Sequence, residues 1–242
     1  MSRRILFSYA HPDDESFLGA GLAMRTRAEG GAAVLVTATS GQRGSAGNPP
    51  LCQPEELAAF RESELRAAAA IIGFDEIHLL GYEDRELAGV DPAEIRGKLV
   101  GLIRRHRPDV VVTFDPNGHN RHTDHIAISR FTMEAVAAAA DPRIEPPAGP
   151  AHAVERVLWT PIRTPWEVAA SADPGAEGGI DFAIDVSAWT ARRAAALHAH
   201  RTQHQSIDRC FFAKPDVDRI LGVETYRQGW GPPLTERPIR AV

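Results

Sequence analysis

Two short polar clusters contain the residues of this sequence that are best suited to chemistry. The first occupies residues 11–15 and reads HPDDE, directly after the apolar run ILFSYA. The second occupies residues 122–125 and reads HTDH, shortly after the run VVVTFD that begins at Val110. Imidazole nitrogens and carboxylate oxygens are ligands that zinc commonly takes in catalytic sites. Together, the two clusters suggest one divalent metal site.

A catalytic zinc site usually has three protein ligands and one position that stays open for water. His11, Asp14 and His125 would supply such a set, although iron, cobalt and manganese accept the same ligand types. The metal makes water acidic enough to act as a nucleophile near neutral pH. A carboxylate that is not a ligand must then accept the proton, and Asp13, next to Asp14, is our candidate for this general base.

The second cluster offers two supporting residues. If the segment opens a helix, His122 lies one turn before His125 on the same face, where it could stabilise an oxyanion or protonate a leaving amine. Asp124 could orient one of the imidazoles through a hydrogen bond. Each cluster taken alone has a plainer interpretation, because acidic residues after a strand often stabilise a helix N-terminus. Their joint occurrence at two strand ends favours a metal site.

Four further residues are open to chemical and to purely structural interpretations. Glu15 is expected as a charge at a helix N-terminus that could also orient His11 or pack near the site. His119 is expected in an exposed loop, although it could line a pocket. His200 and His204 are four apart on a predicted helix, a spacing that can bind metal. A surface or packing role is the simpler expectation for that pair.

The hydrophobic pattern predicts a scaffold that brings the distant clusters together. Nearly continuous apolar runs alternate with helical spacing, which is typical of a parallel sheet covered by helices on both faces. The expected strands are 5–10, 32–39, 77–80 and 110–115, and the expected helices between them are 17–29, 54–72 and 91–107. Functional groups in such sheets gather at the carboxyl ends of the strands. Both clusters follow strands, as do a glycine-rich loop at 40–50 and the sequence GYED at 81–84.

The rest of the chain extends this α/β pattern. The expected elements are a helix over 126–140, a proline-rich connection over 141–151, a strand over 154–160, a polar loop over 167–179, an edge strand over 180–186 and a closing helix over 187–205 capped by Ser187. Nothing in a chain of 242 residues requires two domains. We therefore expect a single domain over 1–242, with a core over 4–140 and further elements over 151–242.

Composition narrows the classes of partner. A net charge of −5 and a pI near 6.1 argue against nucleic acid or an anionic membrane, because binding either requires a basic surface. Cys52 and Cys210 lack metal or redox spacing, and the apolar run after Arg4 is too short for a signal peptide or a membrane span. We expect a cytoplasmic protein with a small-molecule substrate. Its oligomeric state, monomer or homo-oligomer, is left open.

The two clusters also carry a resemblance to a known family. AHPDDE at 10–15 together with HTDH at 122–125 resembles the paired signature of the PIG-L/LmbE-like zinc N-acetylglucosaminyl deacetylases. The resemblance extends through the order of elements over 4–140 and returns in DVS at 185–187 and AHRTQ at 199–203. It implies a Rossmann-like, three-layer α/β/α fold of the LmbE type. It also implies that His11, Asp14 and His125 bind zinc, that Asp13 is the general base and that His122 assists the tetrahedral intermediate.

Two further elements resemble parts of the family that hold the sugar. TSGQRG at 39–44 is similar to its glycine-rich loop, and GYED at 81–84 is similar to its Gly-Tyr-x-Asp element. By that similarity, Arg43 and Asp84 are candidates for holding sugar hydroxyls.

This sequence departs from the family at three positions. Gln42 stands where many relatives carry Glu, and Thr123 stands where the family usually has Pro. Neither change removes a proposed ligand. Asn120 stands where the mycothiol-pathway members have a tyrosine, which argues against that pathway and against a tyrosine-assisted mechanism.

The leading hypothesis is a zinc hydrolase that removes the acetyl group from an N-acetylated amino sugar or a related glycoside. A close alternative is a thiol-conjugate amidase or a natural-product N-deacylase, with pocket length set by residues 42–53 and 160–180. An alternative of another class is a non-catalytic nucleotide-binding or sensor domain. The first strand–helix junction lacks the Gly-x-Gly-x-x-Gly spacing that would bind a dinucleotide.

Overall fold

The chain folds around one sheet. The computed structural model describes residues 2–144, 149–160, 165–168 and 179–241. The strands across these residues are β1 Arg4–Tyr9, β2 Ala32–Thr39, β3 Glu76–Tyr82, β4 Val110–Thr113, β5 Arg156–Trp159, β6 Phe182–Asp185 and β7 Val223–Trp230. They pair in the order β3-β2-β1-β4-β5-β7-β6, with β7 antiparallel to both of its neighbours and the first five strands parallel. The mostly parallel α/β sheet predicted from the sequence is confirmed.

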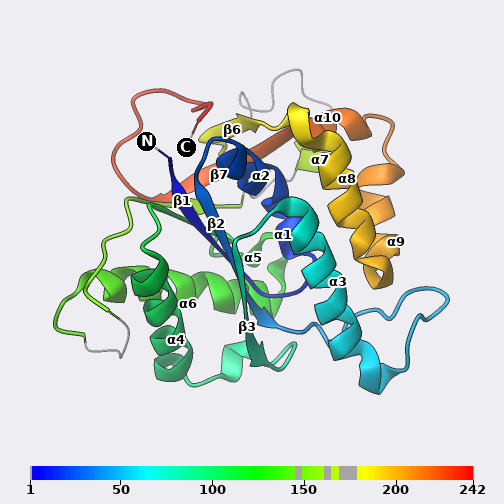
Figure 1. The fold of residues 1–242 in the computed structure, drawn as a ribbon, viewed down its shortest axis with the longest axis horizontal. Helices are drawn as coiled ribbons and strands as arrows, with labels where there is room; N and C mark the ends of the chain where they lie inside the picture. The colour runs from blue at the N-terminus through cyan, green and yellow to red at the C-terminus, as the bar shows by residue number, and fades with distance from the viewer. Residues whose placement is uncertain (1, 145–148, 161–164, 169–178, 242) are drawn as a thin grey trace.

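Helices cover both faces of this sheet (Figure 1). The α-helices of the described residues are α1 Asp14–Leu18, α2 Ala20–Ala28, α3 Leu57–Ile72, α4 Pro92–His106, α5 Gly118–Arg121, α6 Thr123–Ala140, α7 Pro165–Val168, α8 Thr190–Ala199, α9 His204–Ile207 and α10 Val217–Gly222. Helices α4 and α6 pack against each other on one face, while α2, α3 and α8 lie together on the other (Figure 1). The arrangement is the three-layer α/β/α architecture.

The central strand β1 is apolar because both of its faces are covered. It lies between β2 and β4, and the side chains of Ile5, Leu6, Phe7 and Tyr9 are buried. A strand in the middle of a parallel sheet faces helices on both sides, so it shows a continuous apolar run and no alternation.

The carboxyl ends of β1 and β4 meet in the middle of the sheet. These strands pair in parallel, with Phe7 opposite Val112. The chain places β2 and β3 on one side of β1 and then crosses to place β4 on the other side. This reversal opens a crevice at the carboxyl ends, where open α/β sheets bind their ligands. Both polar clusters follow these two strands, so the fold brings them to the same crevice.

The first helical region differs from the expected helix over 17–29. Helix α1 begins at Asp14, inside the first polar cluster, and the chain bends at Gly19 before α2 begins. A Cβ atom at Gly19 would lie 2.8 Å from the Tyr9 hydroxyl and 2.9 Å from the Phe7 ring. Glycine is therefore needed here because the backbone passes directly over β1.

The C-terminal elements match the expectations in part. The expected edge strand over 180–186 is β6, which lies at one end of the sheet. Strand β7 was not expected. The expected helix over 187–205 is wrong in its length, because α8 ends at Ala199 and short helical turns follow His200. Of the expected polar loop over 167–179, residues 169–178 lie outside the described part of the chain.

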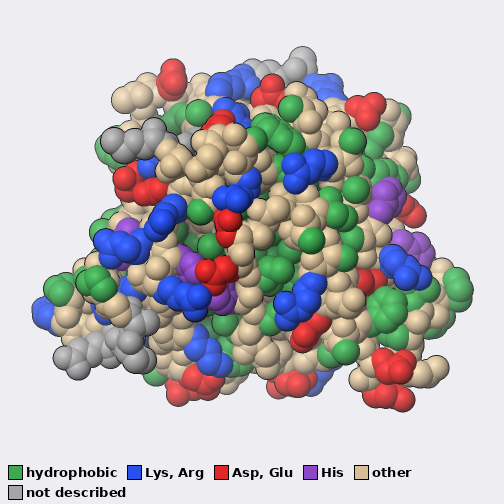
Figure 2. Space-filling model, viewed as in Figure 1, with side chains coloured by type: hydrophobic (Ala, Val, Ile, Leu, Met, Phe, Trp, Pro, Cys, Tyr) green, Lys and Arg blue, Asp and Glu red, His purple; other side chains and the backbone are tan. Residues whose placement is uncertain are grey.

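Charged side chains are mixed on the surface. Figure 2 shows basic and acidic side chains interspersed across the face that it draws. Within the described ranges, no helix combines the length and the apolar character needed to cross a lipid bilayer.

A buried carboxylate ties β7 to the N-terminus of α2. Glu224 accepts hydrogen bonds from the backbone N–H groups of Gly21 and Leu22, each at 2.8 Å, and lies 3.0 Å from the buried guanidinium of Arg193.

The substitution Glu224→Ala is expected to lower the free energy of unfolding by about 3–5 kcal/mol, because it leaves a buried cation without its partner. Denaturant unfolding measures this effect. Glu29→Ala, which breaks an exposed ion pair with Arg25, is the matched control and should change little. Equal stability of the two variants would contradict the expectation.

Candidate metal centre and active site

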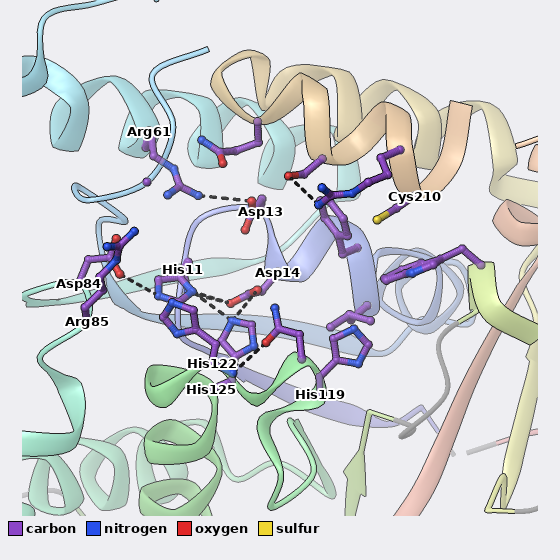
Figure 3. A pocket seen from close by; sticks show the side chains of 18 of the residues that line it. His11, Asp13, Asp14, Arg61, Asp84, Arg85, His119, His122, His125 and Cys210 are labelled. Atoms are coloured by element: carbon purple, nitrogen blue, oxygen red, sulfur yellow. Dashed lines mark hydrogen bonds and ion pairs between the residues drawn. The ribbon is translucent and has the colours of Figure 1, made fainter. Parts of the chain in front are cut away.

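The two polar clusters face one cavity at the carboxyl ends of β1 and β4 (Figure 3). Its volume is about 520 Å³, within the usual range of small-molecule sites. Residues from both clusters line it together with residues of the C-terminal helices; they include His11, Asp13, Asp14, Phe17, Arg61, Asp84, Arg85, His119, His122, His125, Trp166, Gln203, Arg209 and Cys210. Segments more than a hundred residues apart in sequence therefore share one pocket.

Three of these side chains place their donor atoms within metal-binding distance of one another. His11 Nδ1 lies 3.2 Å from His125 Nε2, Asp14 Oδ1 lies 3.4 Å from the same Nε2, and Asp14 Oδ2 lies 3.7 Å from His11 Nδ1. Ligands about 2.0–2.1 Å from a tetrahedral zinc ion are about 3.3–3.4 Å apart. The triangle formed by His11, Asp14 and His125 fits such an ion. This is the convergence that the metal-site hypothesis requires.

Hydrogen bonds leave the inward-facing atom of each side chain available. Nδ1 of His125 donates to the carbonyl of Gly118 at 3.2 Å, which leaves Nε2 with its lone pair. Oδ2 of Asp14 accepts from the backbone N–H groups of His11 and Ala10 at 2.8 and 3.1 Å. Partners of this kind fix the orientation of metal ligands.

His11 is oriented by two carboxylates. Its Nε2 lies 3.2 Å from Asp124 Oδ2 and 3.2 Å from Asp84 Oδ1, so Nε2 carries a proton and Nδ1 is the ring nitrogen that faces His125 and Asp14. Asp124 is held in turn by the backbone N–H groups of Arg85 and Leu87, at 2.6 and 3.2 Å. A carboxylate–imidazole arrangement of this kind is common behind metal-binding histidines. Asp124 therefore lies where it can orient the ring of His11.

The electrostatics of the site follow from its burial. Burial raises the pKa of Asp14 to about 7 and, together with nearby His11 and His122, lowers the pKa of His125 well below its usual value. Burial also acts to lower the pKa of His11, but its hydrogen bonds to Asp124 and Asp84 prevail and raise it to about 10. A neutral His125 is ready to bind a metal, and a cation beside Asp14 would favour its ionised form.

Asp13 and Asp14 both line the cavity, but their side chains point to different parts of it (Figure 3). Its φ of 117° lies in a region that residues with side chains rarely adopt. Burial raises the pKa of Asp13, while the nearby Arg61 acts to lower it. Arg61 lies 3.4 Å from the Asp13 carboxylate and also donates to the carbonyls of Pro12 and Gly41. The carboxylate of Asp13 therefore lines the same cavity as His11, Asp14 and His125 but is not one of the three side chains that form the triangle.

Arg61 was missed by the sequence analysis, although a signal was present. It lies on α3 four residues after Leu57 and four before Leu65, both of them buried. A basic residue in the apolar stripe of a helix indicates a buried ion pair.

His122 lies just before helix α6, not inside it as the predicted helical spacing required. His122 has extended backbone angles and is the N-cap of α6, so it does not lie one helical turn before His125. Its Nδ1 accepts a hydrogen bond from the backbone N–H of Asp124 at 3.2 Å. Its ring centroid is still only 4.7 Å from that of His11 and 5.0 Å from that of His125. Burial lowers the pKa of His122, which keeps the ring neutral.

The two residues suggested for sugar binding have different positions. Asp84 is buried, contacts His11 and accepts a hydrogen bond at 3.0 Å from the backbone N–H of Arg43. The Arg43 side chain is 45% exposed and forms an ion pair with Glu86 at 2.8 Å. Arg43 does not appear among the described residues that line the cavity, whereas Arg61 and Arg85 do.

The remaining histidines differ from their expected positions. His119 is half-buried, lines the cavity and packs edge-on against Trp166, with 5.7 Å between the ring centroids. His200 and His204 do not share a helix, because His200 follows the last residue of α8 and His204 begins α9. The metal-binding spacing considered for this pair is therefore not formed. His200 instead contacts Glu15. One expectation was that Glu15 could orient His11, but its carboxylate pairs with His200.

A second group of possible metal ligands lies at the opposite end of the sheet. Glu76, His78 and His106 bring donor atoms together at the amino end of β3. The two imidazoles already pair with each other at 2.9 Å, and Glu76 already binds Arg105 at 2.9 Å. This group lies outside the cavity and takes no part in the site.

Comparison with known proteins places the chain among deacetylases. The PIG-L family model, described as GlcNAc-PI de-N-acetylase, matches residues 6–136. A curated relative from Geodermatophilus obscurus, 1D-myo-inositol 2-acetamido-2-deoxy-alpha-D-glucopyranoside deacetylase, is 33% identical over 93% of this chain and 92% of the relative.

Solved structures show the same fold. The conserved protein TT1542 from Thermus thermophilus superimposes with a TM-score of 0.71 and 28% identity, covering 97% of this chain and 98% of the other. The N,N'-diacetylchitobiose deacetylase from Pyrococcus horikoshii gives a TM-score of 0.72 at 20% identity, covering 93% and 83% of the two chains. The family match across residues 6–136 and the 33% identity to a nearly full-length relative show that this chain belongs to the PIG-L family.

Proposed function

We propose that this protein is a metal-dependent amide hydrolase that removes the acetyl group from an N-acetylated amino sugar or a related glycoside. The observation that carries the proposal is the triangle of His11, Asp14 and His125 donor atoms, 3.2–3.7 Å apart, with the carboxylate of Asp13 beside it. Relatives named as deacetylases of an acetamido sugar and of diacetylchitobiose support the substrate class. The products would be acetate and a free amine.

We propose zinc as the ion held by His11, Asp14 and His125. Two imidazoles and one carboxylate are a common donor set in catalytic zinc sites, and the distances fit tetrahedral coordination. A divalent cation bound there supplies Lewis acidity, which polarises the acyl carbonyl and lowers the pKa of nearby water. Metal analysis of the purified protein, compared with reconstitution by iron, cobalt and manganese, tests the identity of the ion.

In this proposal Asp13 is the general base. It accepts a proton from the attacking water as the water oxygen bonds to the acyl carbon. When the carbon–nitrogen bond breaks, the same proton passes to the leaving nitrogen, which gives the neutral amine and acetic acid that ionises to acetate. Arg61, 3.4 Å away, holds the carboxylate in place and favours its ionised form.

His122 is suited to stabilising the oxyanion. Because its Nδ1 accepts the backbone N–H of Asp124, the proton of the neutral ring lies on Nε2. His122 lines the cavity, and one of its ring nitrogens lies within 4.8 Å of a ring nitrogen of His11 and of His125. An N–H donor at this place can bind the negative charge that develops on the acyl oxygen.

The substitution His122→Ala is expected to lower kcat by about 10²–10³-fold, the usual effect of removing one oxyanion donor. Metal content should remain at the wild-type level, because the other three side chains hold the ion. Steady-state kinetics and metal analysis of the same preparation measure the two quantities. Loss of the metal from this variant would instead make His122 a ligand.

A second candidate is an amidase or N-deacylase that accepts a larger substrate. One wall of the cavity is aromatic, with Phe17 and Trp166 in edge-on contact at 5.8 Å, and leaves room beyond the metal triangle. Residues 161–164 and 169–178, part of the segment expected to set pocket length, lie outside the described part of the chain. Relative kcat/KM values for N-acetyl and longer N-acyl glycosides separate the two candidates.

Acetate release from a panel of N-acetylated glycosides tests the proposal. The apo protein, the protein with each added metal, and an Asp13→Ala variant are the samples. We expect acetate only from metal-loaded wild-type protein. Stoichiometric metal with no release from any N-acyl compound would contradict the proposal, and nucleotide binding in equilibrium dialysis would favour the sensor alternative.

A further inference from the structure

A completely buried ion pair lies behind the cavity. Glu15 Oε1 and His200 Nε2 are 2.7 Å apart, and both side chains have 0% exposure. Glu15 belongs to the first turn of α1, whereas His200 lies 185 residues later at the end of α8. Taking two charged groups out of water is unfavourable unless each is well paired. The pair therefore needs an explanation beyond filling space, since neither residue lines the cavity.

The other oxygen of Glu15 holds the backbone of Asp13. Glu15 Oε2 accepts the Asp13 N–H at 3.0 Å, and Ser16 donates its hydroxyl to Oε1 at 2.6 Å. Asp13 has a φ of 117°, a conformation that is unfavourable for a residue with a side chain and that persists only when its surroundings enforce it. The Glu15 carboxylate is one of the contacts that enforce it.

Arg61 holds the side chain of Asp13. Its guanidinium binds the Pro12 carbonyl and faces the Asp13 carboxylate (Figure 3). Glu15 thus holds the backbone of Asp13, and Arg61 holds its side chain.

We propose that His200 is a positioning residue that fixes Glu15 and thereby keeps the Asp13 carboxylate directed into the cavity, apart from Asp14. The inference rests on the proposed role of Asp13 as the base. His200 would act only through Glu15, without touching the substrate or the metal ligands.

The residues that follow His200 support the same interpretation. Thr202 donates its backbone N–H and its hydroxyl to the two oxygens of Glu64, at 2.9 and 2.7 Å. Glu64 lies on α3 one turn after Arg61. Gln203 donates to the Ser45 carbonyl at 2.9 Å and lines the cavity. The segment 199–203, which reads AHRTQ, therefore anchors both Glu15 and the helix that carries Arg61. These contacts give a physical reason why this segment resembles a recurring element of the family.

Kinetics of two variants at position 200 test the proposal. His200→Ala is expected to lower kcat by about 10- to 100-fold, as for other residues that orient catalytic groups. KM and metal content should stay near wild type, because the ligands and the cavity wall are unchanged. His200→Gln should recover most of the loss, since its amide N–H can donate to Glu15. His204→Ala is the matched control, because His204 directly follows this segment and does not line the cavity.

The outcomes are separable from those of the proposed function. Unchanged kcat in His200→Ala, or equal losses in the Ala and Gln variants, would overturn the positioning role while wild-type turnover still supported deacetylation. If wild type itself released no acetate, the crystal structure of His200→Ala would decide the inference. A negative φ at Asp13 and a carboxylate turned from the cavity would support it, and an unchanged Asp13 would refute it. If the Ala variant fails to fold, His200→Asn takes its place, because its shorter amide does not reach Glu15.

Discussion

The substitution Asp13→Asn is expected to lower kcat by about 10²–10⁴-fold, the usual contribution of a general base. The amide keeps the size of the side chain and can still contact Arg61 through its oxygen, but it cannot accept a proton. Metal content and KM should remain close to wild type, because Asp13 lies beside the His11–Asp14–His125 triangle and is not one of its corners. Steady-state kinetics and elemental analysis on one preparation give the three quantities.

The matched control for this prediction is Asp218→Asn, which changes an exposed aspartate on α10 that does not line the cavity. It should keep wild-type kcat. Wild-type turnover by Asp13→Asn would remove Asp13 from the base role. Loss of the metal from this variant would make it a ligand and would leave the base to be found elsewhere.

The substitution His125→Ala is expected to abolish both metal binding and turnover. It removes one corner of the triangle and leaves only His11 and Asp14 facing the position of the ion. The loss of metal affinity should exceed the factor of about 10–100 that follows changes to residues behind the ligands. Equilibrium titration with zinc, followed by the rate of acetate release at saturating metal, measures the effect.

His78→Ala provides the control for His125→Ala. It removes an imidazole from the other group of possible ligands, Glu76, His78 and His106, at the far end of the sheet. We expect the metal content and kcat of the wild type from this variant. A variant pair in which His78→Ala loses the metal and His125→Ala keeps it would place the ion at the wrong end of the sheet for the proposed chemistry.

The parts of the fold that the sequence predicted are those governed by local periodicity. Strands β1, β2 and β4 are continuous apolar runs because helices cover both faces, and such runs are visible without tertiary information. The carboxyl ends of parallel strands share one edge, so the convergence of residues 11–15 and 122–125 could be inferred from the alternation of strands and helices alone.

The elements that the sequence did not predict depend on contacts between distant segments. Strand β7 contains Glu224, which looks like a surface residue but is buried against Arg193 and the N-terminus of α2. The helix expected over 187–205 ends at Ala199, and the next residue, His200, pairs with Glu15 from the other end of the chain. No local pattern contains these partners.

Within the site, the residue types were predictable and the side-chain directions were not. Asp84 was a candidate for binding sugar, yet its carboxylate contacts Nε2 of His11. Arg43 was the candidate cation, yet its side chain turns to Glu86 and Arg61 contacts Asp13 instead. Motif spacing fixes where the backbone brings a residue, while the direction of its side chain depends on packing around it.

The central claim is that two distant segments bind one cation, and anomalous diffraction from crystals grown with zinc tests it most directly. Data collected on both sides of the zinc absorption edge locate the ion without reference to activity. The account predicts one strong peak about 2.0–2.2 Å from His11 Nδ1, Asp14 Oδ1 and His125 Nε2. A zinc-loaded crystal with no peak between these three atoms, whether the ion lay elsewhere or nowhere, would contradict it.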